Sequence, residues 1–273
     1  MAKRASVGLK IFMVAASFVL PIAVLLWLMV DGLNGYIDFA RQEIRGGEYQ
    51  AALEEVLFTE ADCVTATGSD ETLATIRAKL PVAKRFLGYG HRVSFAFVTG
   101  ESLSGFGAKR IVKAAATDVI AWDQLGCLSP HVIYVQRGGE TGSEQFAQLL
   151  AEELERREQT EPRGPVPPEV AAAIAARRAI YEVRAVHAPE TMLWRSKDST
   201  AWTVVHEADP LFAASCLHRF IYVKAVADLP EALHGADAVQ GRVSTVGLAA
   251  EEESAKPLAA MLARWGATRV CPL

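Results

Sequence analysis

Blocks of apolar and polar residues alternate along most of the chain. Runs with strand character occur at 61–67, 84–87, 93–98, 132–135, 203–205 and 220–223. Apolar residues spaced like one helix face occur over 70–80, 109–122, 143–157, 168–185 and 251–265. Ser69 or Asp70 is the expected N-cap of the first of these helices. Strands that alternate with helices in this way predict an α/β fold.

The most hydrophobic segment is Ile11 to Val30, which contains no charged residue. A helix of this length spans about 30 Å of hydrocarbon, so we expect a transmembrane anchor over residues 1–31. A cleavable signal peptide is the alternative, but no small-x-small cleavage site follows the run. Residues 32–58 then form a charged amphipathic pattern that predicts a juxtamembrane helix.

Charge gives the expected orientation of this anchor. Lys3, Arg4 and Lys10 precede the apolar run, so the rule that basic residues stay inside predicts a single-pass membrane protein with a cytoplasmic N-terminus. The same rule sends the residues after 31 to the other side. The formal net charge is -4 and the basic residues are scattered among acids, so we do not expect nucleic acid as a partner.

The cysteines give the first chemical signal. There are four, at positions 63, 127, 216 and 271. Their spacing fits neither a disulfide scaffold nor a zinc site, so we expect reduced thiols and no bound metal.

Cys127 differs from the other three in its surroundings. Gly126, Ser129 and Pro130 mark a loop around it, and the apolar run 132–135 follows at once. A thiolate in such a loop can attack a thioester or aldehyde carbonyl, and backbone N–H groups can stabilise the oxyanion. Cys127 is therefore the candidate nucleophile.

Three donors lie near Cys127 in sequence: its own N–H, the N–H of Leu128 and the Ser129 hydroxyl. Which of them faces a bound carbonyl stays open. His131 either polarises the thiol or is an ordinary hydrogen-bonded loop histidine.

A second candidate is the turn Gly68-Ser69 between a predicted strand and a predicted helix. Free N–H groups at a helix start favour phosphate, but Asp70 and Glu71 would repel an anion. The chain has no GxGxxG or GxxxxGKT motif that would specify a nucleotide site.

Five segments carry a family resemblance: ADCVTATGSDETL, GYGHRVSFAFV, WDQLGCLSPHVIYV, TAWTVVHEADP and RVCPL. From about residue 59 to the end, the chain resembles the acyl-CoA reductase (fatty acid reductase) family of bacterial bioluminescence, in the aldehyde dehydrogenase superfamily. The resemblance implies a catalytic region over 59–273. It also implies that Cys127 accepts the acyl group of a long-chain acyl-CoA or other activated donor, and that NADPH reduces the thioester to a long-chain aldehyde. Gly68 and Ser69 match the family's turn next to the nicotinamide end of NADP.

Two departures from the superfamily pattern concern the chemistry. The glutamate that activates water has no counterpart between Phe86 and Ser94, so we expect the acyl-enzyme to resist hydrolysis. The run Ser215–Arg219 stands where a Glu-x-Phe-Gly-Pro motif commonly holds the nicotinamide ribose.

A third departure is that the resemblance begins within the dinucleotide-binding region. We therefore expect a truncated aldehyde-dehydrogenase-like fold after one transmembrane helix. The alternative to an active reductase is a catalytically inactive truncated or chimeric remnant. A homo-oligomer or a partner polypeptide would supply the missing cofactor half. Residues 33–50 resemble the start of a chemoreceptor sensing module, which makes a ligand-sensing module the third hypothesis.

Overall fold

The structure is a computed structural model that describes residues 27–33, 36–37, 41–44 and 50–273. The predicted span Ile11 to Val30 lies outside the described residues except for its last four. Among the residues described, no helix is long and apolar enough to cross a membrane. The chain divides into two compact units, residues 1–89 and 90–273, which we describe one at a time.

The first unit contains one strand–helix–strand motif. Residues 50–60 are helical and lead into β1 (Cys63–Thr67), α2 (Asp70–Lys79) and β2 (Arg85–Tyr89). The two strands pair in parallel, with Cys63 opposite Arg85. Ser69 is the N-cap of α2, because its Oγ accepts the Thr72 N–H at 3.2 Å. It was one of the two residues predicted for this position.

The second unit is built on a seven-stranded sheet in the order β5-β6-β7-β4-β3-β8-β9. Its strands are β3 (Val93–Val98), β4 (Pro130–Gln136), β5 (Met192–Arg195), β6 (Thr203–Glu207), β7 (Phe220–Val226), β8 (Val243–Ala249) and β9 (Arg269–Pro272). The paired strands run in parallel except for the edge pair β5 and β6. Every residue of β3 and β7 is buried, because helices cover both faces.

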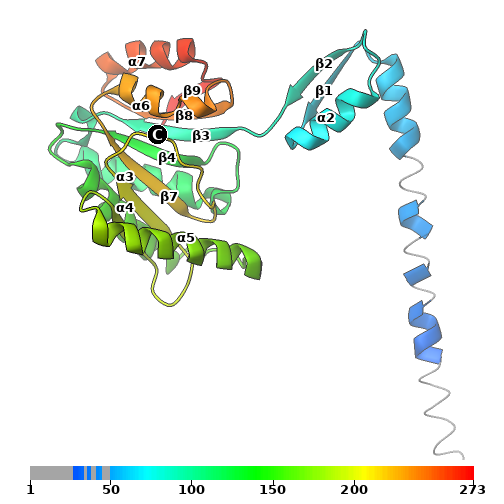
Figure 1. Cartoon of the computed structure of the whole chain (residues 1–273), viewed down its shortest axis with the longest axis horizontal. Coiled ribbons are helices and arrows are strands. Elements are labelled where there is room, and N and C mark those ends of the chain that lie inside the picture. The colour runs from blue at the N-terminus through cyan, green and yellow to red at the C-terminus, as the bar shows by residue number, and fades with distance from the viewer. Residues whose placement is uncertain (1–26, 34–35, 38–40, 45–49) are drawn as a thin grey trace, which may run out of the picture. The chain divides into compact units, whose positions relative to one another are not determined.

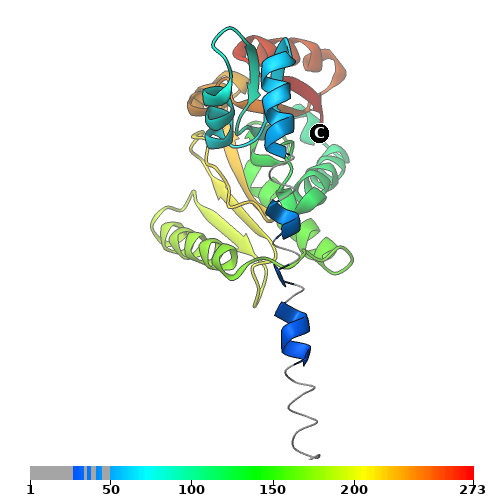
Figure 2. The same ribbon diagram turned by 90° about the vertical axis from the view of Figure 1, so that its right-hand side faces the viewer.

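Helices lie on either side of this sheet (Figures 1 and 2). On one face are α3 (Gly107–Ile120) and α4 (Ser143–Glu158). On the other are α5 (Pro168–His187), α6 (Leu229–Gly235) and α7 (Glu252–Trp265). The α/β prediction is therefore confirmed, while β5, β8, β9 and α6 were not expected from the sequence.

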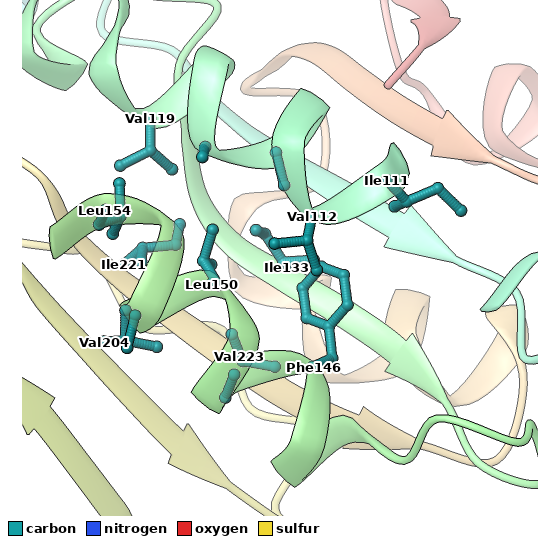
Figure 3. Close-up of a cluster of buried hydrophobic side chains, with 14 of the residues drawn as sticks. Ile111, Val112, Val119, Ile133, Phe146, Leu150, Leu154, Val204, Ile221 and Val223 are labelled. Carbon is teal, nitrogen blue, oxygen red and sulfur yellow. The ribbon is translucent and has the colours of Figure 1, made fainter. Parts of the chain in front are cut away.

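The apolar spacing of α3 and α4 explains how they are held on the sheet. Ile111 and Val112 of α3 are neighbours, Val119 follows Val112 by seven positions and so returns to the same helix face, and all three are buried. Figure 3 shows these side chains with Phe146, Leu150 and Leu154 of α4 over Ile133, Val204, Ile221 and Val223 of the strands. This core fixes the C-terminal end of α3, where the chain turns towards Cys127.

Candidate active site at Cys127

Cys127 lies in the loop between α3 and β4, at the amino end of β4. The Ser129 N–H donates to the Gly126 carbonyl at 2.9 Å and closes a tight turn around the cysteine. Cys127 is exposed and lines a cavity of about 440 Å³. An accessible thiol beside a cavity is the arrangement that a nucleophile requires.

The cavity is formed by segments that are far apart in the sequence. Its lining comes from β3, the end of α3, the Cys127 loop, β8, β9 and the residue that follows β9. Apolar lining residues include Phe95, Ala96, Leu128, Pro272 and Leu273. The cavity can therefore accept an apolar group next to the thiol.

Three polar lining residues were not singled out from the sequence in this role. Asp118 places a carboxyl in the cavity, and burial raises its pKa. Arg269 contributes a guanidinium, and Cys271 a second thiol whose pKa is raised by burial. The prediction that the water-activating glutamate has no counterpart concerned residues 86–94, and Asp118 lies outside that segment.

The chain approaches Cys127 through a left-handed turn. Trp122, Asp123 and Gln124 have φ values of 54°, 50° and 64°. Such a conformation costs about 1 to 2 kcal/mol per residue for a side chain with a Cβ. Gln124 offsets part of this cost, because its buried amide donates to the Pro130 carbonyl at 2.7 Å and to the Phe220 carbonyl at 2.9 Å.

A second left-handed turn, Leu217 to Arg219, is tied to the first. The buried Arg219 guanidinium lies 2.7 Å from a carboxylate oxygen of Asp123 and 2.9 Å from one of Glu158. The ion pair and the Gln124 amide thus join the two strained turns. Strain concentrated next to a candidate nucleophile is typical of functional sites.

His131 is a hydrogen-bonded residue away from the thiol's cavity. Its Nδ1 accepts the Ser215 N–H at 3.1 Å, and its ring packs near Phe212. Burial, and then the charge of His91, lower the pKa of His131 to about 4. His131 does not line the cavity, so the geometry favours an ordinary hydrogen-bonded histidine over a residue that polarises the thiol.

The carbonyl of Cys127 is also held. Ser94 Oγ in β3 donates to the Cys127 carbonyl at 2.7 Å. Ser94 Oγ also accepts the Thr245 N–H of β8 at 3.2 Å. This contact joins residues 33 positions apart, and no local pattern in the sequence predicts it.

The family profile that matches this chain is that of acyl-CoA reductase (LuxC), over residues 47–273. The chain belongs to the acyl-CoA reductase (LuxC) family. Among curated proteins, none matches in sequence. The family match begins at residue 47, so the chemoreceptor resemblance of residues 33–50 lies almost entirely outside it and stays a prediction.

Solved structures that include aldehyde dehydrogenases share the fold of this family member. Bifunctional proline utilization A is 15% identical, with a TM-score of 0.59 over 82% of this chain and 23% of its own. A gamma-glutamyl-gamma-aminobutyraldehyde dehydrogenase from Burkholderia cenocepacia is 15% identical, with a TM-score of 0.57 over 80% of this chain and 45% of its own. An NADP-dependent glyceraldehyde-3-phosphate dehydrogenase from Bacillus halodurans, solved with NADP, is 14% identical, with a TM-score of 0.54 over 80% and 45%. This chain thus spans less than half the length of these proteins, and the likeness confirms the aldehyde-dehydrogenase-like fold.

The predicted cofactor turn, Gly68-Ser69, lies in the 1–89 unit. Gly68 donates its N–H to the Tyr89 carbonyl at 3.2 Å, and the Ser69 Oγ is the cap of α2. Both groups therefore already have partners within the unit, and Asp70 and Glu71 occupy the first turn. The cofactor role of Gly68 and Ser69 stays a prediction. Within the described part of the chain, no group of three or more His, Cys, Asp or Glu residues could hold a metal ion.

Proposed function

We propose that this family member carries out the acyl-transfer step of an acyl-CoA reductase at Cys127. The substrate is a long-chain acyl-CoA or another activated acyl donor, and the final product is a long-chain aldehyde. The observation that carries the proposal is the exposed Cys127 thiol beside a cavity with apolar lining.

The step forms one bond and breaks another. The Cys127 thiolate attacks the acyl carbonyl carbon, the new C–S bond forms, and the bond from that carbon to the sulfur of coenzyme A breaks. Coenzyme A leaves as a thiolate and takes up the proton that Cys127 released. The N–H groups of Cys127 and Leu128 are the proposed donors to the oxyanion.

NADPH is the proposed reductant, because the family is one of acyl-CoA reductases and a structural neighbour was solved with NADP. When bound, it would supply the hydride that converts the thioester to the aldehyde. The helix start after Gly68 and Ser69 does not fit the phosphates of the cofactor, because the acids Asp70 and Glu71 in its first turn would repel them. A second polypeptide or a second copy of the chain would have to provide those contacts.

The acids at this helix start favour the second candidate, an inactive remnant that keeps the thiol but not the reduction. The predicted anchor bears on the same choice, because its orientation would place Cys127 away from the cytoplasmic NADPH and acyl-CoA. A reporter fused to the C-terminus would determine the side of the membrane.

Mass spectrometry of the full chain tests the acyl transfer directly. After incubation with palmitoyl-CoA, the wild type should gain one acyl group, and hydroxylamine should remove it. Cys127→Ser should gain none. Cys63→Ser is the matched control, because Cys63 is also an exposed free thiol but lies in the other unit.

The site of the adduct and the fate of NADPH separate the remaining outcomes. An adduct mapped to Cys271, or an unmodified wild type, would overturn the proposal for Cys127. Loss of NADPH absorbance with release of aldehyde would support the active reductase, whereas a stable thioester without NADPH consumption would support the remnant.

A further inference from the structure

Ser94 is a buried hydroxyl between the Cys127 loop and the centre of the sheet. It is the second residue of β3 and is only 1% exposed. Its Oγ donates to the Cys127 carbonyl at 2.7 Å and accepts the Thr245 N–H of β8 at 3.2 Å. One hydroxyl thus joins the candidate nucleophile to two strands.

The strand pairing explains why a side chain makes this link. The register of β3 against β4 shifts between Ser94 and Phe95, and the register against β8 shifts between Val93 and Ser94. At such irregularities the regular backbone ladder is interrupted. Ser94 Oγ therefore serves as an acceptor for the Thr245 N–H, and its own proton is directed to Cys127.

Within Leu125–Ser129, the other hydrogen bonds described are local. Leu125 N–H donates to the Trp122 carbonyl, and Ser129 N–H donates to the Gly126 carbonyl. These bonds shape the turn, whereas the bond from Ser94 fixes the turn against the sheet at the peptide that follows Cys127. Holding that peptide also fixes the direction of the Leu128 N–H, because the carbonyl and the N–H belong to one planar unit.

We propose that Ser94 is a positioning residue for Cys127. It holds the Cys127–Leu128 peptide so that the thiol and the Leu128 N–H meet the same acyl carbonyl. This inference rests on the proposed acyl transfer. A misplacement of about 1 Å at a reacting group can cost about 100-fold in rate, so one hydrogen bond at this position matters for the reaction.

The test is the rate of thioester formation from palmitoyl-CoA in the full chain carrying Ser94→Ala. At saturating acyl-CoA the rate should fall by about 10- to 100-fold with little change in KM, because the substituted group orients the thiol and does not bind substrate. Thermal unfolding is recorded on the same samples.

Ser102→Ala is the matched control. Ser102 is 4% exposed, and its Oγ also donates to a backbone carbonyl, that of Thr99 at 2.8 Å. It follows the carboxyl end of β3, away from the Cys127 loop. The two alanine variants should lose similar stability, and only Ser94→Ala should lose the acylation rate.

Two further variants keep the inference falsifiable if Ser94→Ala does not fold. Ser94→Cys replaces the hydroxyl with a slightly larger thiol that is a weak donor, so it should be folded and slow. Ser94→Thr keeps the hydroxyl and should recover most of the rate. If Ser94→Cys and Ser94→Ala acylate as fast as Ser102→Ala, or if Ser94→Thr is as slow as Ser94→Cys, the inference is wrong. A wild type that is never acylated would instead overturn the proposed function.

Discussion

The two ends of the sheet in the 90–273 unit differ in whether their reactive side chains are paired and buried or accessible. At the carboxyl end, the Lys224 ammonium lies 2.7 Å from Glu207 and 3.0 Å from Asp209, and Arg184 lies 2.8 Å from the other Glu207 oxygen. Lys224 and Glu207 are both buried. At the amino end, Cys127 is exposed beside a cavity, and protein contacts hold its backbone.

The difference separates a structural cluster from a candidate site. At the carboxyl end the charged atoms themselves are paired, so each would have to lose a partner before it could act on a substrate. At the amino end the contacts reach the peptide carbonyl of Cys127 and leave the thiol accessible. Proximity of titratable groups is therefore a weaker sign of function than an accessible group on a fixed backbone.

Removing Lys224, the buried cation of the cluster at the carboxyl end of the sheet, should have the largest effect on stability. Lys224→Met leaves the buried Glu207 without its closest cation, which should lower the free energy of unfolding by about 3 to 5 kcal/mol. Urea unfolding followed by tryptophan fluorescence measures this, because four of the five tryptophans lie in the 90–273 unit.

Lys197→Met is the control for this variant, since Lys197 is exposed and its loss should change stability by less than about 0.5 kcal/mol. Cys127→Ser belongs in the same series: it should abolish acylation and also stay within about 0.5 kcal/mol. A Lys224→Met protein as stable as the wild type would remove the contrast between the two ends.

The buried His131 should make stability depend on pH. Its pKa is about 4 in the folded protein and about 6.5 when unfolded, so the unfolded chain binds more protons between these values. The contribution of His131 to the free energy of unfolding is fully present above about pH 6.5. It is lost as the pH falls towards 4, by about 3 kcal/mol in all. Unfolding free energies measured over this range should show the slope.

His131→Asn isolates this contribution. Asparagine keeps an acceptor for the Ser215 N–H but does not titrate. The stability of the variant should therefore vary less between pH 6.5 and 4 than that of the wild type. His206, whose pKa burial also lowers, is present in both proteins and cancels from the difference. Equal slopes for the two proteins would show that His131 is not the group that titrates.

The strands and helices that the sequence predicted are those with long, regular apolar patterns. Val93–Val98 agrees with its prediction in both bounds, because every residue of this strand is buried between helices. β8 was not predicted, since Thr245 and Gly247 interrupt its apolar run. β5 and β9 are edge strands of four residues each, too short for a clear pattern.

In the candidate site, too, residues with a local sequence signal were predicted, and residues brought together only by the fold were not. Cys127 was found because its signal is local: glycine, serine and proline around a cysteine before a buried strand. Ser94 and Cys271 come from distant strands, and only the folded sheet brings them to the Cys127 loop or its cavity. The left-handed turns were missed because they contain no glycine that would mark a positive φ.

Asp123→Asn should have the smallest effect of the three stability changes discussed here, because the pair at the amino end is less enclosed than the Lys224 cluster. Asp123 is 24% exposed, and Arg219 keeps Glu158 as a partner. Asparagine tolerates the positive φ, so the change removes the charge without new backbone strain and should cost about 1.5 kcal/mol in urea unfolding. Asp198→Asn is the matched control, since Asp198 also has a positive φ but is exposed, and it should stay within about 0.5 kcal/mol. If the two variants are equally stable, the ion pair does not hold the strained turns together, and the Gln124 amide must carry that role alone.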